Sequence, residues 1–182
     1  MRVARMREEL RAMVKAAVSD GPVQLSSGAL SDFYIDGRQV TLNPRGAFLL
    51  ANVVSGILAD LQFDAVGGPT MGADPIVGAL CYHLGLIEGQ TVTGFIIRKE
   101  SKEHGLGRRI EGPDLSEGAR VVIVEDIVTS AGSVLKGIKA VEEAGARVVK
   151  VIAIVDREAG GREALNGAGY DYQPVFSLSE LT

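Results

Sequence analysis

Apolar residues recur along this chain with two periods, one helical and one typical of short buried strands. Near the amino terminus Met6, Leu10, Val14 and Ala17 lie at helical spacing and predict an amphipathic helix that ends near residues 20–22, Asp-Gly-Pro. Its apolar stripe is most simply explained as a face that packs on a core. The chain therefore begins with a helix of ordinary globular character.

Two short runs follow, Val23–Leu25 and Asp32–Asp36, on either side of the polar turn Ser26-Ser27-Gly28. Runs of this length around a turn rich in Ser and Gly are typical of a β-hairpin. We expect a small hairpin lobe, a hood over about residues 20–40, that stands apart from any main sheet.

Helices and strands then alternate. Asn43 is a favourable N-cap and Pro44 a favourable first helical residue, so a helix is predicted from there through Leu58. Further strands are expected at 64–66, 92–97, 121–124 and 148–155, and helices at about 75–84, capped by Asp74, and at 134–144, stopped by Gly145. This alternation predicts an α/β fold, a doubly wound and mainly parallel twisted sheet flanked by helices, in one domain over residues 1–182.

The segment Val121–Ser133, VVIVEDIVTSAGS, carries the clearest chemistry. An apolar strand leads into a loop of small residues, 129–133, that opens a helix. Hydroxyls and unobstructed N–H groups at a helix N-terminus favour an anion such as a phosphate. Glu125 and Asp126 precede the loop and would repel a bare phosphate, so they are expected to meet ribose hydroxyls or Mg²⁺. The predicted ligand is a sugar phosphate.

Three more segments are expected at the same edge of the sheet, because ligands of open α/β sheets gather at the carboxyl ends of the strands. The glycine-rich run 67–74 is either a second anion cradle or a tight strand-to-helix turn. The run 98–109 holds five basic side chains and His104, and is either a solvated surface or a lid over departing charge. Arg157 either pairs locally or binds an anionic substrate.

Composition excludes several classes of protein. The chain has 182 residues, 46% of them hydrophobic, and a formal net charge of −4, which disfavours a general nucleic-acid binder. Cys81 is the single cysteine, so a disulfide framework is excluded and a reducing compartment, the cytoplasm, is expected. No apolar run is long enough for a bilayer, and neither a P-loop nor a dinucleotide-binding glycine motif is present. His83 is expected to be structural.

These motifs resemble a known family. VVIVEDIVTSAGS is similar to the 5-phosphoribosyl-1-pyrophosphate (PRPP) motif of type I phosphoribosyltransferases, and RKESKEHGLGRRIEG, residues 98–112, resembles the catalytic loop of orotate phosphoribosyltransferases. The hood LSSGALSDFYIDGR and the sequence VDRE at 155–158 resemble that family too. Because no barrel domain follows these motifs, the chain resembles the stand-alone enzyme rather than the fused UMP synthase. The resemblance implies a transfer of phosphoribosyl from PRPP to orotate that gives orotidine 5′-monophosphate.

The resemblance assigns roles to individual positions. Lys102, His104 and Asp126 are implied as catalytic, in a mobile catalytic loop at about 98–110 and on the PRPP motif. Orotate is implied to contact Phe33, Tyr34, Thr129 and Arg157. The implied PRPP-binding residues are Arg98, Lys99, Lys102, His104, Glu125, Asp126, Ile127, Val128, Thr129, Ser130, Ala131, Gly132 and Ser133. Mg²⁺ is implied to arrive with PRPP rather than on a protein site, and a homodimer is implied to share the catalytic loop.

Two positions depart from the family pattern. Ser26 and Gly72 stand where many relatives carry lysine, which removes positive charge near the expected ligands. Arg108 and Arg109 could compensate, or backbone donors could hold the ligands. Two rival functions stay open on sequence: a purine salvage phosphoribosyltransferase and a PRPP-binding regulator without catalysis, although the latter would normally need a DNA-binding appendage.

Overall fold

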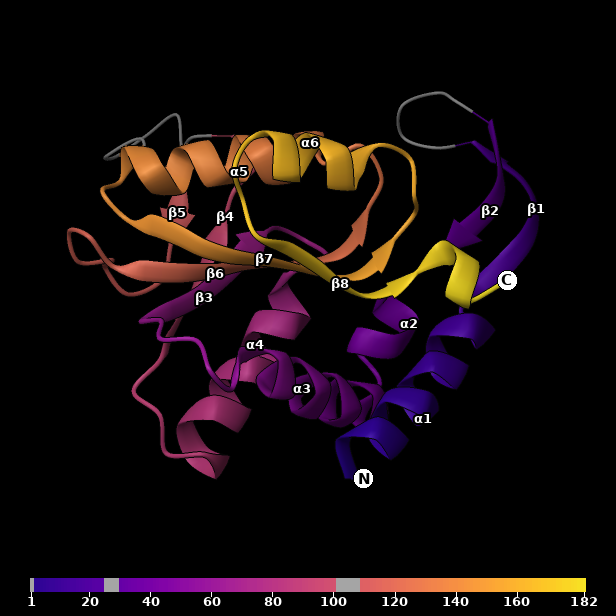
Figure 1. Ribbon diagram of the computed structural model, residues 1–182, viewed down its shortest axis with the longest axis horizontal. Coiled ribbons are helices and arrows are strands. Elements are labelled where there is room, and N and C mark those ends of the chain that lie inside the picture. Colours follow the sequence, from indigo (N-terminus) through magenta and orange to yellow (C-terminus); the bar gives the residue numbers. More distant parts are fainter. Residues whose placement is uncertain (1, 25–29, 101–108) are drawn as a thin grey trace.

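A six-stranded sheet lies between two layers of helices in the computed structural model, which describes residues 2–24, 30–100 and 109–182 (Figure 1). The strand order is β5-β4-β3-β6-β7-β8, and every pairing is parallel except that of β5 with β4. The strands are β3 (Ala65–Pro69), β4 (Thr93–Ile97), β5 (Ile110–Glu111), β6 (Arg120–Val128), β7 (Arg147–Asp156) and β8 (Tyr172–Ser177). The predicted α/β sheet is confirmed.

Helices cover both faces of this sheet, and each face has its own core (Figure 1). Leu10, Leu49 and Leu80 are buried between the sheet and the lower layer, and Ile138 and Leu165 between the sheet and the upper layer. The lower layer holds α1 (Arg2–Ala16), α2 (Arg38–Thr41), α3 (Pro44–Leu58) and α4 (Asp74–Tyr82), and the upper layer holds α5 (Gly132–Glu143) and α6 (Gly161–Gly167). No helix of the described segments is long and apolar enough to cross a membrane.

The hood is an antiparallel pair, β1 (Val18–Gln24) with β2 (Leu30–Ile35), set apart from the main sheet as predicted (Figure 1). Its first strand begins earlier than expected, because α1 already ends at Ala16. The Gly-Pro pair at 21–22, which suggested a break, lies at a shift of register between Asp20 and Val23. Glycine and proline are tolerated at such a bulge, so they interrupt the strand ladder without ending the strand.

Helix starts were predicted with mixed success. Asn43 caps α3 as expected, its side chain accepting from the backbone N–H groups of Arg45 and Gly46. Asp74 does not cap α4: the N-cap is Ala73, and Asp74 is the first helical residue. Its Oδ2 atom accepts from Thr70 Oγ1 at 2.8 Å, so the carboxylate holds the preceding loop rather than the helix end.

Gly145 ends α5 as predicted. It has φ +88°, and its N–H donates to the carbonyl of Glu142 while Ala146 donates to that of Val141, the pairing of a left-handed helix stop. The apolar pattern did not predict four short elements, α2, β5, α6 and β8. It also missed a π-helical turn, His83–Ile87, that prolongs α4. His83 is buried and pairs with Glu88 at 2.9 Å, in keeping with a structural role.

Two central strands run further than their apolar cores suggested. β3 continues to Pro69 and β6 to Val128, so Glu125 and Asp126 lie within a strand instead of after it. Pairing with β7 extends β6, with Glu125 opposite Ala153 and Val128 opposite Asp156. From β3 the chain moves to β4 on one side of the sheet, while β6 and β7 occupy the other. Carboxyl ends that diverge in this way leave a crevice for ligands.

Candidate active site

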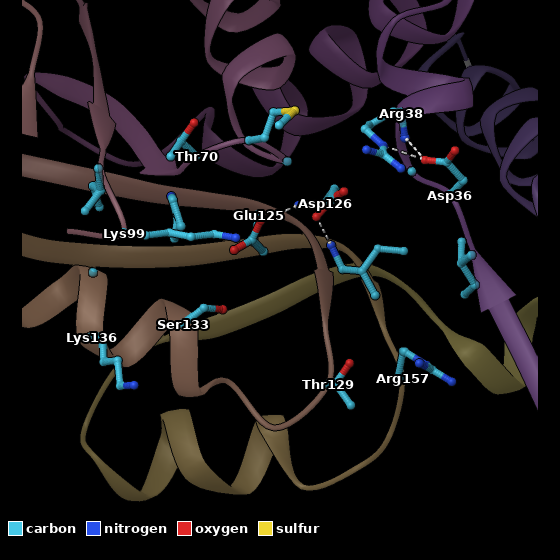
Figure 2. Close-up of a pocket in the computed structure, with 18 of the residues that line it drawn as sticks. Asp36, Arg38, Thr70, Lys99, Glu125, Asp126, Thr129, Ser133, Lys136 and Arg157 are labelled. Carbon is cyan, nitrogen blue, oxygen red and sulfur yellow. Dashed lines mark hydrogen bonds and ion pairs between the residues drawn. The ribbon is translucent and has the colours of Figure 1, made fainter. Parts of the chain in front are cut away.

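A cavity of about 720 Å³ opens at this crevice, between the carboxyl ends of the central strands and the hood (Figure 2). It draws residues from the hood side, the β3–α4 loop, the end of β4, the second half of β6, the start of α5 and the residue after β7. Its walls are Tyr34, Ile35, Asp36, Gly37, Arg38, Pro69, Thr70, Met71, Gly72, Ile97, Arg98, Lys99, Arg109, Glu125, Asp126, Ile127, Thr129, Ser133, Lys136, Gly137 and Arg157.

Asp126 sits in the middle of the cavity, held between two glycines (Figure 2). A Cβ added at Gly72 would lie 2.4 Å from Asp126 Oδ1, and one added at Gly37 would lie 3.0 Å from Asp126 Cβ. The backbone N–H of Ile127 donates to Oδ1 at 2.8 Å. A side chain at position 72 would therefore require the Asp126 carboxylate to shift, and the glycine leaves space for the carboxylate where it lies.

Glu125 is the buried member of the acid pair, with 6% of its surface exposed. Burial, together with the neighbouring charge of Asp126, raises the pKa of Glu125 to about 9. Asp74 adds to the same effect. Glu125 is therefore neutral near pH 7 in the ligand-free cavity. Its Oε1 atom accepts from the backbone N–H of Asp126 at 3.2 Å, which ties the two acids together.

The predicted phosphate loop reaches the cavity with two of its side chains, Thr129 and Ser133. Ala131 adopts a left-handed conformation, φ +62°, as the N-cap of α5, a geometry that costs about 1 kcal/mol outside glycine. Among the described residues no side chain caps the first N–H groups of the twelve-residue helix α5, so these donors are left for another partner. Val128 is 1% exposed and packs in the core, so its side chain does not face the cavity.

The glycine-rich run 67–74 has two structurally different parts. Gly67 and Gly68 are strand residues whose missing side chains serve packing, because an added Cβ would lie 2.4 Å from the Phe95 ring and 2.0 Å from the Val124 carbonyl oxygen. The next four residues, 69–72, line the cavity. The peptide bond between Thr70 and Met71 is cis.

Positive charge dominates the walls. Six basic side chains line the cavity against three acidic ones, of which Glu125 is neutral near pH 7. Arg98, Lys99, Arg109 and Lys136 belong to the β4 and α5 side, and Arg38 and Arg157 to the hood side (Figure 2). Such a distribution suits a ligand with negative groups at both ends and a neutral, hydroxylated middle above Asp126.

Comparison with known proteins points to the same site. Residues 38–168 match the family model described as the phosphoribosyl transferase domain, which spans every wall of the cavity except part of the hood. The orotate phosphoribosyltransferase of Streptomyces coelicolor is 46% identical over 178 residues, covering 97% of each chain. The chain belongs to the orotate phosphoribosyltransferase family. That of Aquifex aeolicus is 42% identical over 179 residues and covers 96% of this chain and 97% of its own.

Solved structures of the family agree with the fold. The orotate phosphoribosyltransferase of Mycobacterium tuberculosis, in a complex with Fe(III) dicitrate, superposes with a TM-score of 0.84 at 38% identity, covering 97% of this chain and 98% of its own. A structure of the same enzyme in complex with PRPP gives a TM-score of 0.81 at 34% identity, with the same coverage. The type I phosphoribosyltransferase architecture of this family member is thereby established.

Most of the site residues expected in this family member come together. Tyr34, Arg98, Lys99, Glu125, Asp126, Ile127, Thr129, Ser133 and Arg157 all line the cavity, whereas Ser130, Ala131 and Gly132 shape the loop behind it. Lys102 and His104, with the hood turn that contains Ser26, lie outside the described residues. So does the side chain of Phe33, although its backbone belongs to β2.

Sequence reasoning gave no role to three polar members of the wall in this phosphoribosyltransferase, Asp36, Arg38 and Lys136, and named Arg109 only as a charge that could replace a missing lysine. Asp36 and Arg38 pair with each other at 2.8 Å in the connection from the hood to α2. Lys136 follows Ser133 by three residues, so the helical period places both on one face of α5. That period was the available signal for Lys136, since the start of α5 was predicted.

Proposed function

We propose that this cavity transfers the 5-phosphoribosyl group of PRPP to orotate, forming orotidine 5′-monophosphate and pyrophosphate. The observation that best supports this proposal is the position of Asp126, which lies between the predicted phosphate loop and two groups of basic side chains. PRPP has phosphate at one end, pyrophosphate at the other and a diol between them. Membership of the orotate phosphoribosyltransferase family supports orotate as the acceptor.

Each end of the ligand has matching donors. The 5′-phosphate would rest on the loop Thr129–Ser133, and the ribose hydroxyls would donate to Asp126. Arg98 and Lys99 would meet the pyrophosphate, together with Lys102 and His104 outside the described residues. Orotate would lie on the hood side against Phe33, Tyr34 and Thr129, with its carboxylate facing Arg157.

The reaction exchanges one bond at the anomeric carbon. Orotate N1, which gives up its proton, attacks C1 while the bond from C1 to the pyrophosphate oxygen breaks, with inversion. Positive charge develops on the ribose ring and negative charge on the departing oxygen. A carboxylate under the ring and cations at the pyrophosphate stabilise this state more than the ground state, and stabilisation of that kind raises kcat.

Mg²⁺ fits this cavity as a partner of PRPP rather than as a resident ion. Carboxylate oxygen is the ligand chemistry that Mg²⁺ prefers, and Asp126 presents it in the cavity beside the buried Glu125. Within the described segments no three acidic, His or Cys side chains converge on one point. We therefore propose that Asp126 shares the ion with PRPP oxygens, and that the ion neutralises phosphate charge when bound.

The deciding experiment is an assay of the purified protein with PRPP and Mg²⁺, following the loss of orotate, with hypoxanthine and uracil as alternative acceptors. Orotate should be consumed only when PRPP is present, and pyrophosphate should appear in equal amount. Turnover of hypoxanthine but not orotate would overturn the assignment. Binding of PRPP without turnover of any acceptor would favour the regulator.

We further propose a cytoplasmic homodimer, with residues outside 38–168 completing the same domain. Leu10 and Val14 of α1 share a core with Leu49 of α3, which supports one domain.

The homodimer is supported by exposed aromatic side chains on the lower helices. Phe48 and Tyr82 are 41% and 60% exposed, and they form an apolar surface that a second copy could cover. Sedimentation should give twice the mass of one chain, and Tyr82→Glu should shift this toward the monomer. A single-chain mass at micromolar concentration would contradict the proposal.

A further inference from the structure

Arg109 links three parts of the cavity wall that are distant in sequence. Its guanidinium donates to the carbonyl oxygen of Arg98 through Nε at 3.3 Å and Nη2 at 3.2 Å, and to the carbonyl oxygen of Lys136 through Nη1 at 3.4 Å. Its own carbonyl accepts from the N–H of Arg98 at 2.8 Å. The residue thus joins the end of β4, the start of β5 and helix α5.

These three segments already approach closely at the same junction. A Cβ added at Gly137, next to Lys136 on α5, would lie 3.2 Å from Ile97 Cδ1 and 3.4 Å from Pro69 Cγ. Ile97 pairs with Ile110 in the antiparallel ladder of β4 with β5. Arg98 also pairs with Glu111 at 3.4 Å. The junction is therefore built to hold a fixed distance between β4 and α5.

That distance separates two groups of ligand-facing residues. Arg98 and Lys99 line the cavity directly after β4, and Ser133 lines it one helical turn before Lys136. A guanidinium can serve both carbonyls at once because its donors form a rigid planar fork, whereas a lysine amine is a single point donor on a flexible stem. The Arg109 guanidinium therefore holds the carbonyl groups of Arg98 and Lys136 at a fixed spacing, and we call this set of contacts the clasp.

We propose that Arg109 is a positioning residue that sets the spacing between the pyrophosphate-facing cations and the 5′-phosphate loop. The inference rests on the proposed function, since it takes PRPP as the ligand that spans both groups. A ligand that engages two subsites at once gains affinity only when their spacing fits it. Ribose 5-phosphate or pyrophosphate alone engages a single subsite, so its affinity does not depend on the spacing between the two.

Three binding measurements on Arg109→Lys test the clasp: PRPP, ribose 5-phosphate and pyrophosphate, each by calorimetry with Mg²⁺. PRPP should bind about tenfold more weakly than to the unaltered protein, while each fragment should bind within about twofold. Arg120→Lys is the matched control, because Arg120 also bridges elements, to Asp64, but at the opposite end of the strands. It should leave all three affinities unchanged.

Other outcomes would overturn the inference. Loss of pyrophosphate affinity equal to the loss for PRPP would make Arg109 a direct ligand contact. Unchanged PRPP affinity would mean that Arg109 contributes only a positive charge, which lysine can replace. A lowered Tm together with a reduced affinity for all three ligands would mean that Arg109 has only a structural role. Should Arg109→Lys fail to fold, Gly137→Ala offers a second variant, since its Cβ would press α5 away from Ile97 and should weaken PRPP selectively.

Failure of the proposed function would look different. A regulator or a transferase for another acceptor would still bind PRPP, and the three binding measurements would still test Arg109. Only if PRPP is not the ligand at all would the unaltered protein bind neither PRPP nor its fragments. The clasp would be judged in that case from amide hydrogen exchange at Arg98 and Lys99, which Arg109→Lys should accelerate and Arg120→Lys should not. Equal exchange in both variants would overturn the clasp independently of any ligand.

Discussion

Asp126→Asn should lower kcat by about a hundredfold or more with little change in the thermal midpoint. Asparagine keeps the shape that fits between Gly37 and Gly72, and its Oδ1 can still accept from the N–H of Ile127. The variant loses the negative charge that we propose lies under the ribose ring, and in that proposal the charge matters most when the C1–O bond breaks. Steady-state rates with orotate and PRPP, alongside a melting curve, measure both effects.

The control for this variant is Asp171→Asn. Asp171 pairs with Lys150 at 2.7 Å and does not line the cavity, so its loss removes an ion pair without touching the site. Its kcat should stay within about twofold of the unaltered protein, since Asp171 lies outside the cavity. An Asp126→Asn enzyme that retained half of its turnover would show that the carboxylate charge has no part in the chemistry.

Glu125→Gln should flatten the pH dependence of stability. The pKa of Glu125 is about 9 in the folded chain against 4.5 when exposed, so folding takes up a proton between these values. Unfolding free energy therefore falls as pH rises from about 5 to 9, by about 1.4 kcal/mol per pH unit for one such group. Glutamine cannot ionise, and the variant should be the more stable form at pH 8.

Urea unfolding at pH 6, 7 and 8 measures this difference. Glu143→Gln is the matched control, because Glu143 is exposed on α5 and its pairing with Lys139 at 3.8 Å is a surface contact. It should follow the slope of the unaltered protein. Parallel slopes for all three proteins would mean that Glu125 is charged in the folded state at neutral pH, and that burial does not hold its proton.

The same pattern that predicted the fold also explains where prediction stopped. Strong local signals were reliable: Asn43 before Pro44 began a helix, and Gly145 ended one. The pattern ended the strand before Glu125, because a buried acid within a strand has no local signature. That Glu125 belongs to the strand depends on its pairing with β7. The cap at Asp74 failed for a similar reason, since Thr70 competes for its carboxylate.

The site was predicted to the extent that its residues follow one another in the chain. Thr129 and Ser133 could be placed from the strand-to-helix transition alone. Arg109 could not, because its partners Arg98 and Lys136 become neighbours only when β4 meets α5. Arg38 pairs locally with Asp36, but it lines the cavity only because the hood meets the sheet there. The absence of a lysine at position 72 appeared on sequence to be a loss of charge. In the structure the glycine also leaves space for the Asp126 carboxylate, which a side chain at position 72 would displace.

The contact of Asp126 with Gly37 and Gly72 has a consequence for how this site can change by substitution. One glycine comes from the hood side and one from the β3–α4 loop, so neither position can gain a side chain unless the acid moves. Substitutions at 37, 72 and 126 should therefore be strongly epistatic. A side chain gained at position 72 should move the Asp126 carboxylate, so its effect on turnover should depend on which residues stand at 37 and 126. A directed-evolution library that varies the three positions together should therefore find more active variants than one that varies each alone.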